Sequence, residues 1–131
     1  TSAHLCSWAG IAPGNNESAG KRKSGKTKKG NKKLRSALVE AARSAARTKN
    51  TYLSSLYRRI AARRGANRAA VAVAHRILVI IYHLLKRKQT YNELGPHYYE
   101  ERKHHHVARQ AIKKLETLGY TVTVEKQDQT A

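Results

Sequence analysis

The sequence is poor in the residues that build several common kinds of site. Its 131 residues include one cysteine, one tryptophan and two prolines, and neither phenylalanine nor methionine. The single cysteine, Cys6, excludes an internal disulfide and a zinc site made of several cysteines, and we expect its thiol to be buried. With no methionine at its start and no signal-peptide pattern, the chain is expected to be the C-terminal piece of a longer protein.

Acidic residues are also scarce, and their scarcity gives the chain its charge. There are eight acids against 27 lysines and arginines, so the formal net charge is +19. No two acids have a spacing that suits general acid–base catalysis. Positions 1–89 hold 21 of the bases and only Glu17 and Glu40, whereas positions 90–131 are neutral. This imbalance predicts a polyanionic partner that binds the first two thirds of the chain.

The sequence lacks an uninterrupted apolar run long enough for a membrane span. The most apolar segment, 69–85, contains His75, Arg76 and His83 and is shorter than the roughly 20 residues that a bilayer requires. We therefore interpret this segment as the central helix of a core and expect no membrane partner.

Apolar residues recur at helical spacing in several segments, which predicts an all-α fold. The predicted helices run from Asn31 to near Lys49, from Thr51 or Tyr52 to Arg64, from Asn67 to Lys88, and from Tyr98 or Glu100 to Leu118. Residues 1–9 read as the end of a further short helix, with Leu5, Trp8 and Ala9 on one side. Residues 120–125 alternate with period two and favour a short strand, although no certain second strand is present. We expect one domain over 1–131, a bundle of about four helices with a basic N-terminal loop.

The stretch 9–35 stands out from these helical segments. A loop rich in Gly, Pro and Asn presents Ser18, and nine cations follow it without an acid. Between packed elements, such a basic segment favours contact with a phosphate backbone, the alternative being a solvated tail. The predicted DNA-binding residues are Lys21, Arg22, Lys23, Lys26, Lys28, Lys29, Lys32, Lys33 and Arg35. Arginines on the next two helices either extend this surface or form ordinary charged helix faces.

Ser18 is the candidate nucleophile for a phosphodiester, because Lys21, Arg22 and Lys23 would offset the charge that develops on the phosphoryl oxygens. A turn-forming serine has the same local pattern, and Ser24 is a competing candidate. The run His104–His106 suggests a metal-binding site. Three successive helical residues point about 100° apart, however, so they cannot all bind one ion, and we predict no metal site. Tyr98 and Tyr99 suit either base stacking or packing.

Two longer stretches carry a family resemblance. WAGIAPGNNESAGK at 8–21 and KKGNKKLR at 28–35 resemble the C-terminal transposase domain of a bacterial insertion-sequence family, and LETLGYTVTV at 115–124 is similar to the end of that domain. Members of the family resemble serine-dependent DNA recombinases joined to an N-terminal DEDD domain, and some are guided by a structured bridge RNA. The match is closest over residues 1–47.

The resemblance implies a role for Ser18, which falls on the family's serine position, as the group that attacks DNA and forms a transient phosphoserine bond. It further implies that the DEDD carboxylates and their Mg²⁺ ions come from another domain in a multimeric complex, and that this chain holds no cofactor of its own. A homo-oligomer, DNA and a structured guide RNA are the implied partners, in the cytoplasm of a bacterium and associated with its nucleoid. This chain alone is then expected to be inactive.

The sequence therefore favours a transposase or site-specific recombinase domain that binds DNA and supplies a serine nucleophile. The alternative is a non-catalytic basic module that contacts structured RNA or DNA, in which Ser18 is only a turn residue. A third interpretation is an oligomerisation domain whose apolar third helix pairs between protomers.

Overall fold

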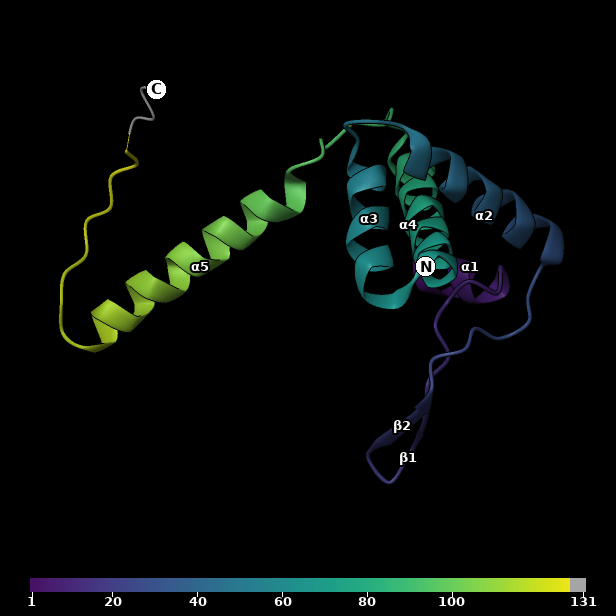
Figure 1. The fold of residues 1–131 in the computed structure, drawn as a ribbon, viewed down its shortest axis with the longest axis horizontal. Helices are drawn as coiled ribbons and strands as arrows, with labels where there is room; N and C mark the ends of the chain where they lie inside the picture. The colour runs from purple at the N-terminus through teal and green to yellow at the C-terminus, as the bar shows by residue number, and fades with distance from the viewer. Residues whose placement is uncertain (128–131) are drawn as a thin grey trace. The chain divides into compact units, whose positions relative to one another are not determined.

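The computed structural model describes residues 1–127. Its contacts divide the chain into two compact units, Thr1–Pro96 and His97–Ala131, and each is described by itself. Within the described residues there are five helices and one two-stranded sheet (Figure 1). The fold is therefore mostly helical, as predicted. The prediction of a single domain over 1–131 stays a prediction.

The helices begin and end close to the predicted residues, and a capping side chain marks the start of three of them. They are α1 (Ser2–Trp8), α2 (Lys32–Arg47), α3 (Tyr52–Arg64), α4 (Ala66–Arg87) and α5 (Tyr98–Thr117). Asn31 Oδ1 accepts a hydrogen bond from the Leu34 amide at the start of α2, and Thr51 Oγ1 accepts one from the Ser54 amide at the start of α3. Such side chains satisfy amides that have no partner within the helix, which makes helix starts predictable.

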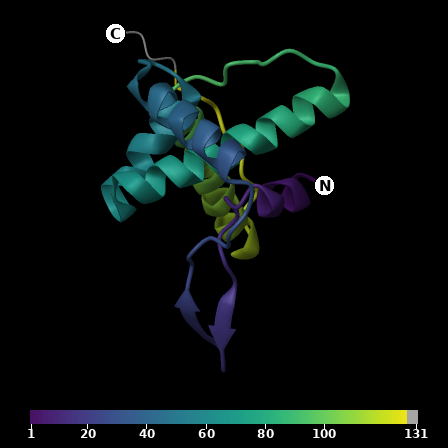
Figure 2. The ribbon, with the colours of Figure 1, turned by 90° about the vertical axis from the view of Figure 1, so that its right-hand side faces the viewer.

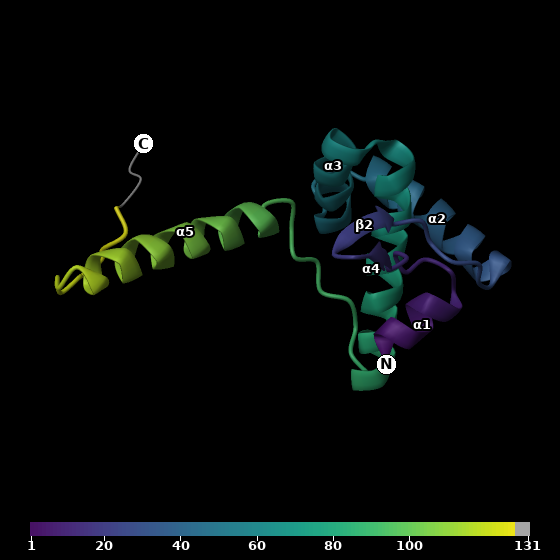
Figure 3. The same ribbon diagram turned by 90° about the horizontal axis from the view of Figure 1, so that it is seen from below.

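The core of the first unit surrounds the N-terminal half of α4, which lies against α1, α2 and α3 (Figures 1 and 3). Most of the residues that it buries there are small, so neighbouring helices approach closely. The buried apolar residues of the unit are Cys6, Ala9, Ile11, Leu38, Ala42, Tyr52, Leu56, Ala69, Ala70, Val73, Ala74 and Leu78. The central position predicted for this helix is confirmed for its first half, whereas Ile81 and Leu85 near its end are exposed.

By length and composition alone, α4 is apolar enough to cross a membrane. The central helix of a bundle meets the same criterion, and α4 packs against three other helices of its unit. His75, Arg76 and His83 also lie within it. We therefore treat α4 as the core helix of the bundle.

The short helix α1 packs differently from the expectation. Trp8 is 59% exposed, whereas Cys6, Ala9 and Ile11 are fully buried. Cys6 is buried, as expected, and burial raises the pKa of its thiol. Cys6, Ala9 and Ile11, rather than the aromatic ring of Trp8, fix this end of the chain to the bundle.

The segment that follows α4 is tied back to α3 by Glu93. Its Oε1 accepts hydrogen bonds from the amides of Tyr52 (2.6 Å) and Gly95 (3.0 Å), and its Oε2 accepts one from the Tyr91 hydroxyl. A carboxylate at a helix N-terminus is favourable because the unpaired amides there carry positive partial charge. The pKa of Tyr91 is raised by burial, then by the charge of Glu93 and its hydrogen bond.

The second unit contains α5, which buries none of its side chains. Residues 120–127 have no regular structure, so the short strand predicted over 120–125 is wrong for the described residues. Alternating Thr and Val favour an extended chain, but a strand needs a partner for its backbone groups, and no strand of the described residues pairs with this segment.

Candidate nucleic-acid-binding hairpin

The stretch 9–35 forms a hairpin on a stalk, and the helices hold it at its root. The hairpin consists of β1 (Asn16–Ser18) and antiparallel β2 (Lys21–Ser24). It extends away from the helices of its unit (Figures 1 and 2). The prediction of an irregular loop around Ser18 is therefore wrong, since Ser18 is the last residue of a strand.

A two-residue turn joins the strands, and its backbone explains the hairpin. Ala19 and Gly20 both have positive φ, 51° and 75°. This is the combination that two-residue turns of type I′ require, and their twist matches that of the strands they connect. The usual sequence signal for such a turn is Asn-Gly or Asp-Gly. Ala-Gly carries no such signal, which is why the strands were not predicted.

The stalk is held at its root by hydrogen bonds between distant residues. Arg35 Nη1 donates to the Gly10 carbonyl oxygen (2.7 Å) and to Thr27 Oγ1 (2.9 Å). The Asn31 amide donates to the Trp8 carbonyl oxygen (3.0 Å). The guanidinium thus joins the start of α2 to both arms of the stalk. Its predicted role in DNA binding stays a prediction, but one of its nitrogens already has partners within the protein.

Close backbone contacts also hold the two arms together, and they require glycine. A Cβ added to Gly30 would collide with the Gly10 amide nitrogen and would lie 2.6 Å from the carbonyl carbon of Ala9. A Cβ added to Gly14 would collide with the Lys26 carbonyl oxygen. The sequence does not predict these contacts, because the paired positions are 12 and 20 residues apart.

The predicted cations lie along the whole stalk. Three are on β2, three on the arm that leads to α2, and three in the first turn of α2. Eight of the nine are exposed, and only Arg35 is half-buried. The first turn of α2 contains no acid. Because a helix N-terminus is itself positive, Lys32 and Lys33 add to its charge and increase the attraction for an anion.

Ser18 and Ser24, the two candidate nucleophiles, differ in their surroundings. Ser18 is exposed, and within residues 1–127 its hydroxyl has no hydrogen-bond partner. The Ser24 hydroxyl accepts a hydrogen bond from the Lys26 amide (3.1 Å). Ser24 thus stabilises the bend into the stalk, whereas the Ser18 hydroxyl is available to a ligand.

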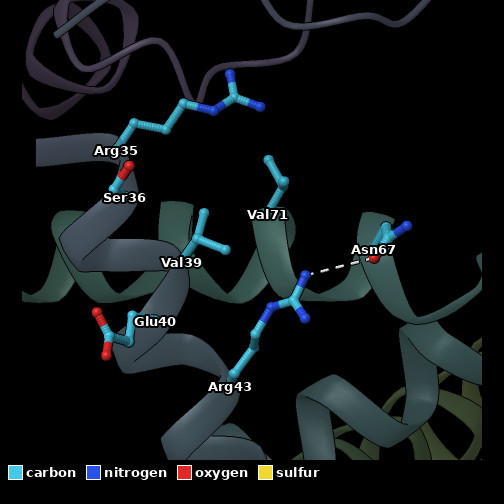
Figure 4. A pocket seen from close by; sticks show the side chains of 7 residues that line it. All are labelled: Arg35, Ser36, Val39, Glu40, Arg43, Asn67 and Val71. Carbon is cyan, nitrogen blue, oxygen red and sulfur yellow. Dashed lines mark hydrogen bonds between the residues drawn. The ribbon is translucent and has the colours of Figure 1, made fainter. Parts of the chain in front are cut away.

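A shallow groove of about 420 Å³ lies between α2 and α4, beside the root of the stalk (Figure 4). It is lined by Arg35, Ser36, Val39, Glu40, Arg43, Asn67 and Val71. Arg43 Nη2 on α2 donates a hydrogen bond to Asn67 Oδ1 on α4 (3.4 Å), which joins the two helices across the groove. Val39 and Val71 supply apolar contact across the groove.

The other candidate residues are on α5. His104, His105 and His106 are exposed, and nowhere in the described chain do three His, Cys, Asp or Glu side chains form a group that could hold a metal. The resemblance places its Mg²⁺ ions in another domain, and that expectation stays a prediction. Tyr98 and Tyr99 lie edge to face with ring centroids 5.4 Å apart, and the Arg102 guanidinium lies over Tyr98.

A comparison with known protein families matches the part of the chain that contains the hairpin and its stalk. Residues 1–58 match the model of the transposase IS116/IS110/IS902 family. The range matched by the IS116/IS110/IS902 model contains the hairpin, the stalk, α2 and the first half of α3, and so includes Ser18 and all nine cations. No curated protein and no solved structure matches the chain. The resemblance to an insertion-sequence transposase is thus supported at the level of the family, and its serine/DEDD type stays a prediction.

Proposed function

We propose that this chain is part of an insertion-sequence transposase, in which it binds DNA and presents Ser18 as the nucleophile for strand cleavage and exchange. The observation that carries the proposal is the hairpin. Within the range that matches the transposase family, one exposed serine closes the turn of a basic hairpin that extends from the helices. A β-ribbon of this kind is narrow enough to enter a DNA groove.

In the proposed reaction, Ser18 Oγ forms a bond to phosphorus while a phosphorus–oxygen bond of the DNA backbone breaks. The serine hydroxyl gives up its proton, the leaving deoxyribose oxygen takes one up, and the reaction needs no net electron transfer. Exchange then reverses these bonds with a different strand end. The energy of the phosphodiester is kept in the protein–DNA ester, so the strands can be rejoined without another energy source.

The base that removes the serine proton is proposed to come from outside this chain. Of the described residues, no His, Asp or Glu is hydrogen-bonded to Ser18. The resemblance assigns carboxylates and Mg²⁺ to another domain of a multimer, and we derive no step through a metal. A composite site of this kind makes the chain inactive alone and makes an oligomer part of the proposal.

The direct test substitutes Ser18 in the protein expressed from its complete reading frame. The probe is a plasmid that carries the DNA on either side of that reading frame. We expect Ser18→Ala to abolish covalent protein–DNA adducts, recovered under denaturing conditions, and to leave non-covalent DNA binding unchanged. Ser24→Ala is the matched control and should retain the adducts. Adducts that persist in Ser18→Ala would contradict the assignment of the nucleophile.

The DNA-binding part of the proposal has its own test. Neutralising Lys26, Lys28 and Lys29 together should weaken binding and lower the slope of log affinity against log salt by about 0.9 for each phosphate that the protein no longer neutralises. Lys113 and Lys114 on α5 provide a control pair outside the stalk. An unchanged slope in the triple variant would show that the stalk does not touch the DNA backbone.

The second candidate function is a non-catalytic module that binds structured RNA or DNA. It is favoured by one observation: of the described residues, no His, Asp or Glu is hydrogen-bonded to Ser18, so they supply no base for its hydroxyl. The adduct experiment separates the two functions. A wild-type protein that binds DNA or RNA with a steep salt dependence, but never forms an adduct, has the second function.

A further inference from the structure

The register of the hairpin distinguishes among the three cations that follow Ser18. Ser18 pairs directly with Lys21 across the two-residue turn. Directly opposed residues of an antiparallel pair project from the same face, with Cβ atoms about 4.5–5.5 Å apart. The long side chain of Lys21 therefore accompanies the Ser18 hydroxyl on one face of the hairpin.

Arg22 lies on the opposite face, since successive residues of a strand alternate. Its partner in the register is Glu17, the only acid of the hairpin. Its guanidinium is folded back toward the stalk, where Nη2 would lie 3.2 Å from a Cβ added to Gly25. Arg22 therefore lies on the face opposite Ser18, and its guanidinium points back toward the stalk and away from the Ser18 hydroxyl.

The strand pairing does not place Lys23 on either face of the hairpin. The register passes from the pair of Glu17 and Arg22 to the pair of Asn16 and Ser24, so Lys23 is the extra residue of a β-bulge. A bulge leaves its extra residue without a partner and bends the strand locally. Of the three neighbouring cations, the ladder therefore places only Lys21 beside the candidate nucleophile.

We propose that Lys21 contacts the same phosphate that Ser18 attacks, and that Arg22 contacts a different part of the DNA or stabilises the hairpin. The inference rests on the proposed function. As the Ser18 oxygen approaches phosphorus, negative charge increases on the phosphoryl oxygens, and an ammonium held on the same face offsets it. The charge sequence alone gives all three cations the same role, and only the strand pairing separates them.

The experiment compares Lys21→Ala with Arg22→Ala in the protein expressed from its complete reading frame, with the plasmid described above. Each variant removes one adjacent cation from the same strand, so each should weaken DNA binding and lower the salt slope by a similar amount. The rate of adduct formation is measured with protein in saturating excess over DNA, which removes the effect of affinity. We expect this rate to fall by roughly 10²-fold in Lys21→Ala and by less than about threefold in Arg22→Ala.

A conservative substitution tests whether the lower rate in Lys21→Ala comes from the missing charge or from a disturbed structure. Lys21→Arg keeps a cation on the same face and should recover most of the rate that Lys21→Ala loses, while far-ultraviolet circular dichroism checks the fold of all three variants. Equal rates in Lys21→Ala and Arg22→Ala, or a reduced rate in Lys21→Ala that saturating protein restores, would overturn the inference while Ser18 remains the nucleophile. A wild-type protein that forms no adduct would overturn both this inference and the proposed function.

Discussion

The hairpin and the helical bundle of the first unit are stabilised in opposite ways. The bundle buries small and apolar side chains around α4, and nearly every side chain of β1 and β2 is exposed. The stalk is held instead by Arg35, by backbone hydrogen bonds and by glycines in close contact. The difference shows how the chain can present many positive charges outward: the groups that hold the stalk are mostly backbone atoms, so the side chains are left available to a ligand.

This comparison makes its strongest prediction for the bundle. Leu78 and Leu85 lie on the same helix, 4% and 75% exposed. Leu78→Ala should lower the free energy of unfolding by about 2–5 kcal/mol, because it removes buried apolar atoms and leaves a cavity. Leu85→Ala should change it by less than about 0.5 kcal/mol. Urea titrations measure both, and similar decreases would show that the exposed end of α4 is covered by a partner.

The next prediction concerns the root of the stalk. Gly30→Ala forces a Cβ into the backbone of residues 9 and 10 and should cost about 1–3 kcal/mol. Gly25→Ala is the matched control, because its Cβ would meet only the movable end of the Arg22 side chain. We expect Gly30→Ala alone to reduce adduct formation as well, measured as for Ser18. A stable and fully active Gly30→Ala protein would show that the arms do not need this close approach.

A smaller effect is expected at Arg35. Arg35→Ala removes hydrogen bonds to Gly10 and Thr27 at a half-buried site, and should lower stability by about 1 kcal/mol. Arg35→Lys keeps the charge but cannot reproduce the planar fork of the guanidinium, so it should lose most of the same stability. Thermal melting of both variants tests this. Full recovery in Arg35→Lys would assign the residue to charge rather than to hydrogen bonding.

The smallest predicted effect is a pH dependence within the bundle. Burial, and then the charge of Arg76, lowers the pKa of His75 from its usual value of 6.5. The unfolded chain therefore binds a proton at this site before the folded chain does, and stability falls as the pH is lowered below about 6.5. The midpoint of thermal unfolding, followed from pH 7.5 to 5.5, should decrease less in His75→Gln. Parallel curves would remove His75 as the cause.

Much of the helical architecture was predictable because its signals are local. Asn31 and Thr51 precede apolar residues at helical spacing, and Gly65 separates α3 from α4. The hairpin was not predictable from such signals. Its strands are three and four residues long, they contain no apolar residue, and they carry no alternation from which a strand could be recognised.

The candidate site was predicted in part. The residues that carry its charge, and Ser18 itself, were found from composition and from a family resemblance, and they fall within the range that matches a transposase family. The residues that hold the hairpin and its stalk in place were not predicted from the sequence. The contacts of Gly14 with Lys26 and of Gly30 with Gly10 depend on chain segments meeting in space, and a glycine in a basic segment gives no indication of its partner.

The sequence by itself determined the helices, the buried cysteine, the excess of positive charge before residue 90 and the serine at the start of the basic stretch, because each follows from residue type and spacing. Only the tertiary structure decided that the basic stretch is a hairpin on a stalk, that Arg35 faces inward and that Lys21 shares a face with Ser18. The physical reason is that strand register and backbone contact are relations between distant residues, and the pairing of distant residues is fixed only when the chain folds.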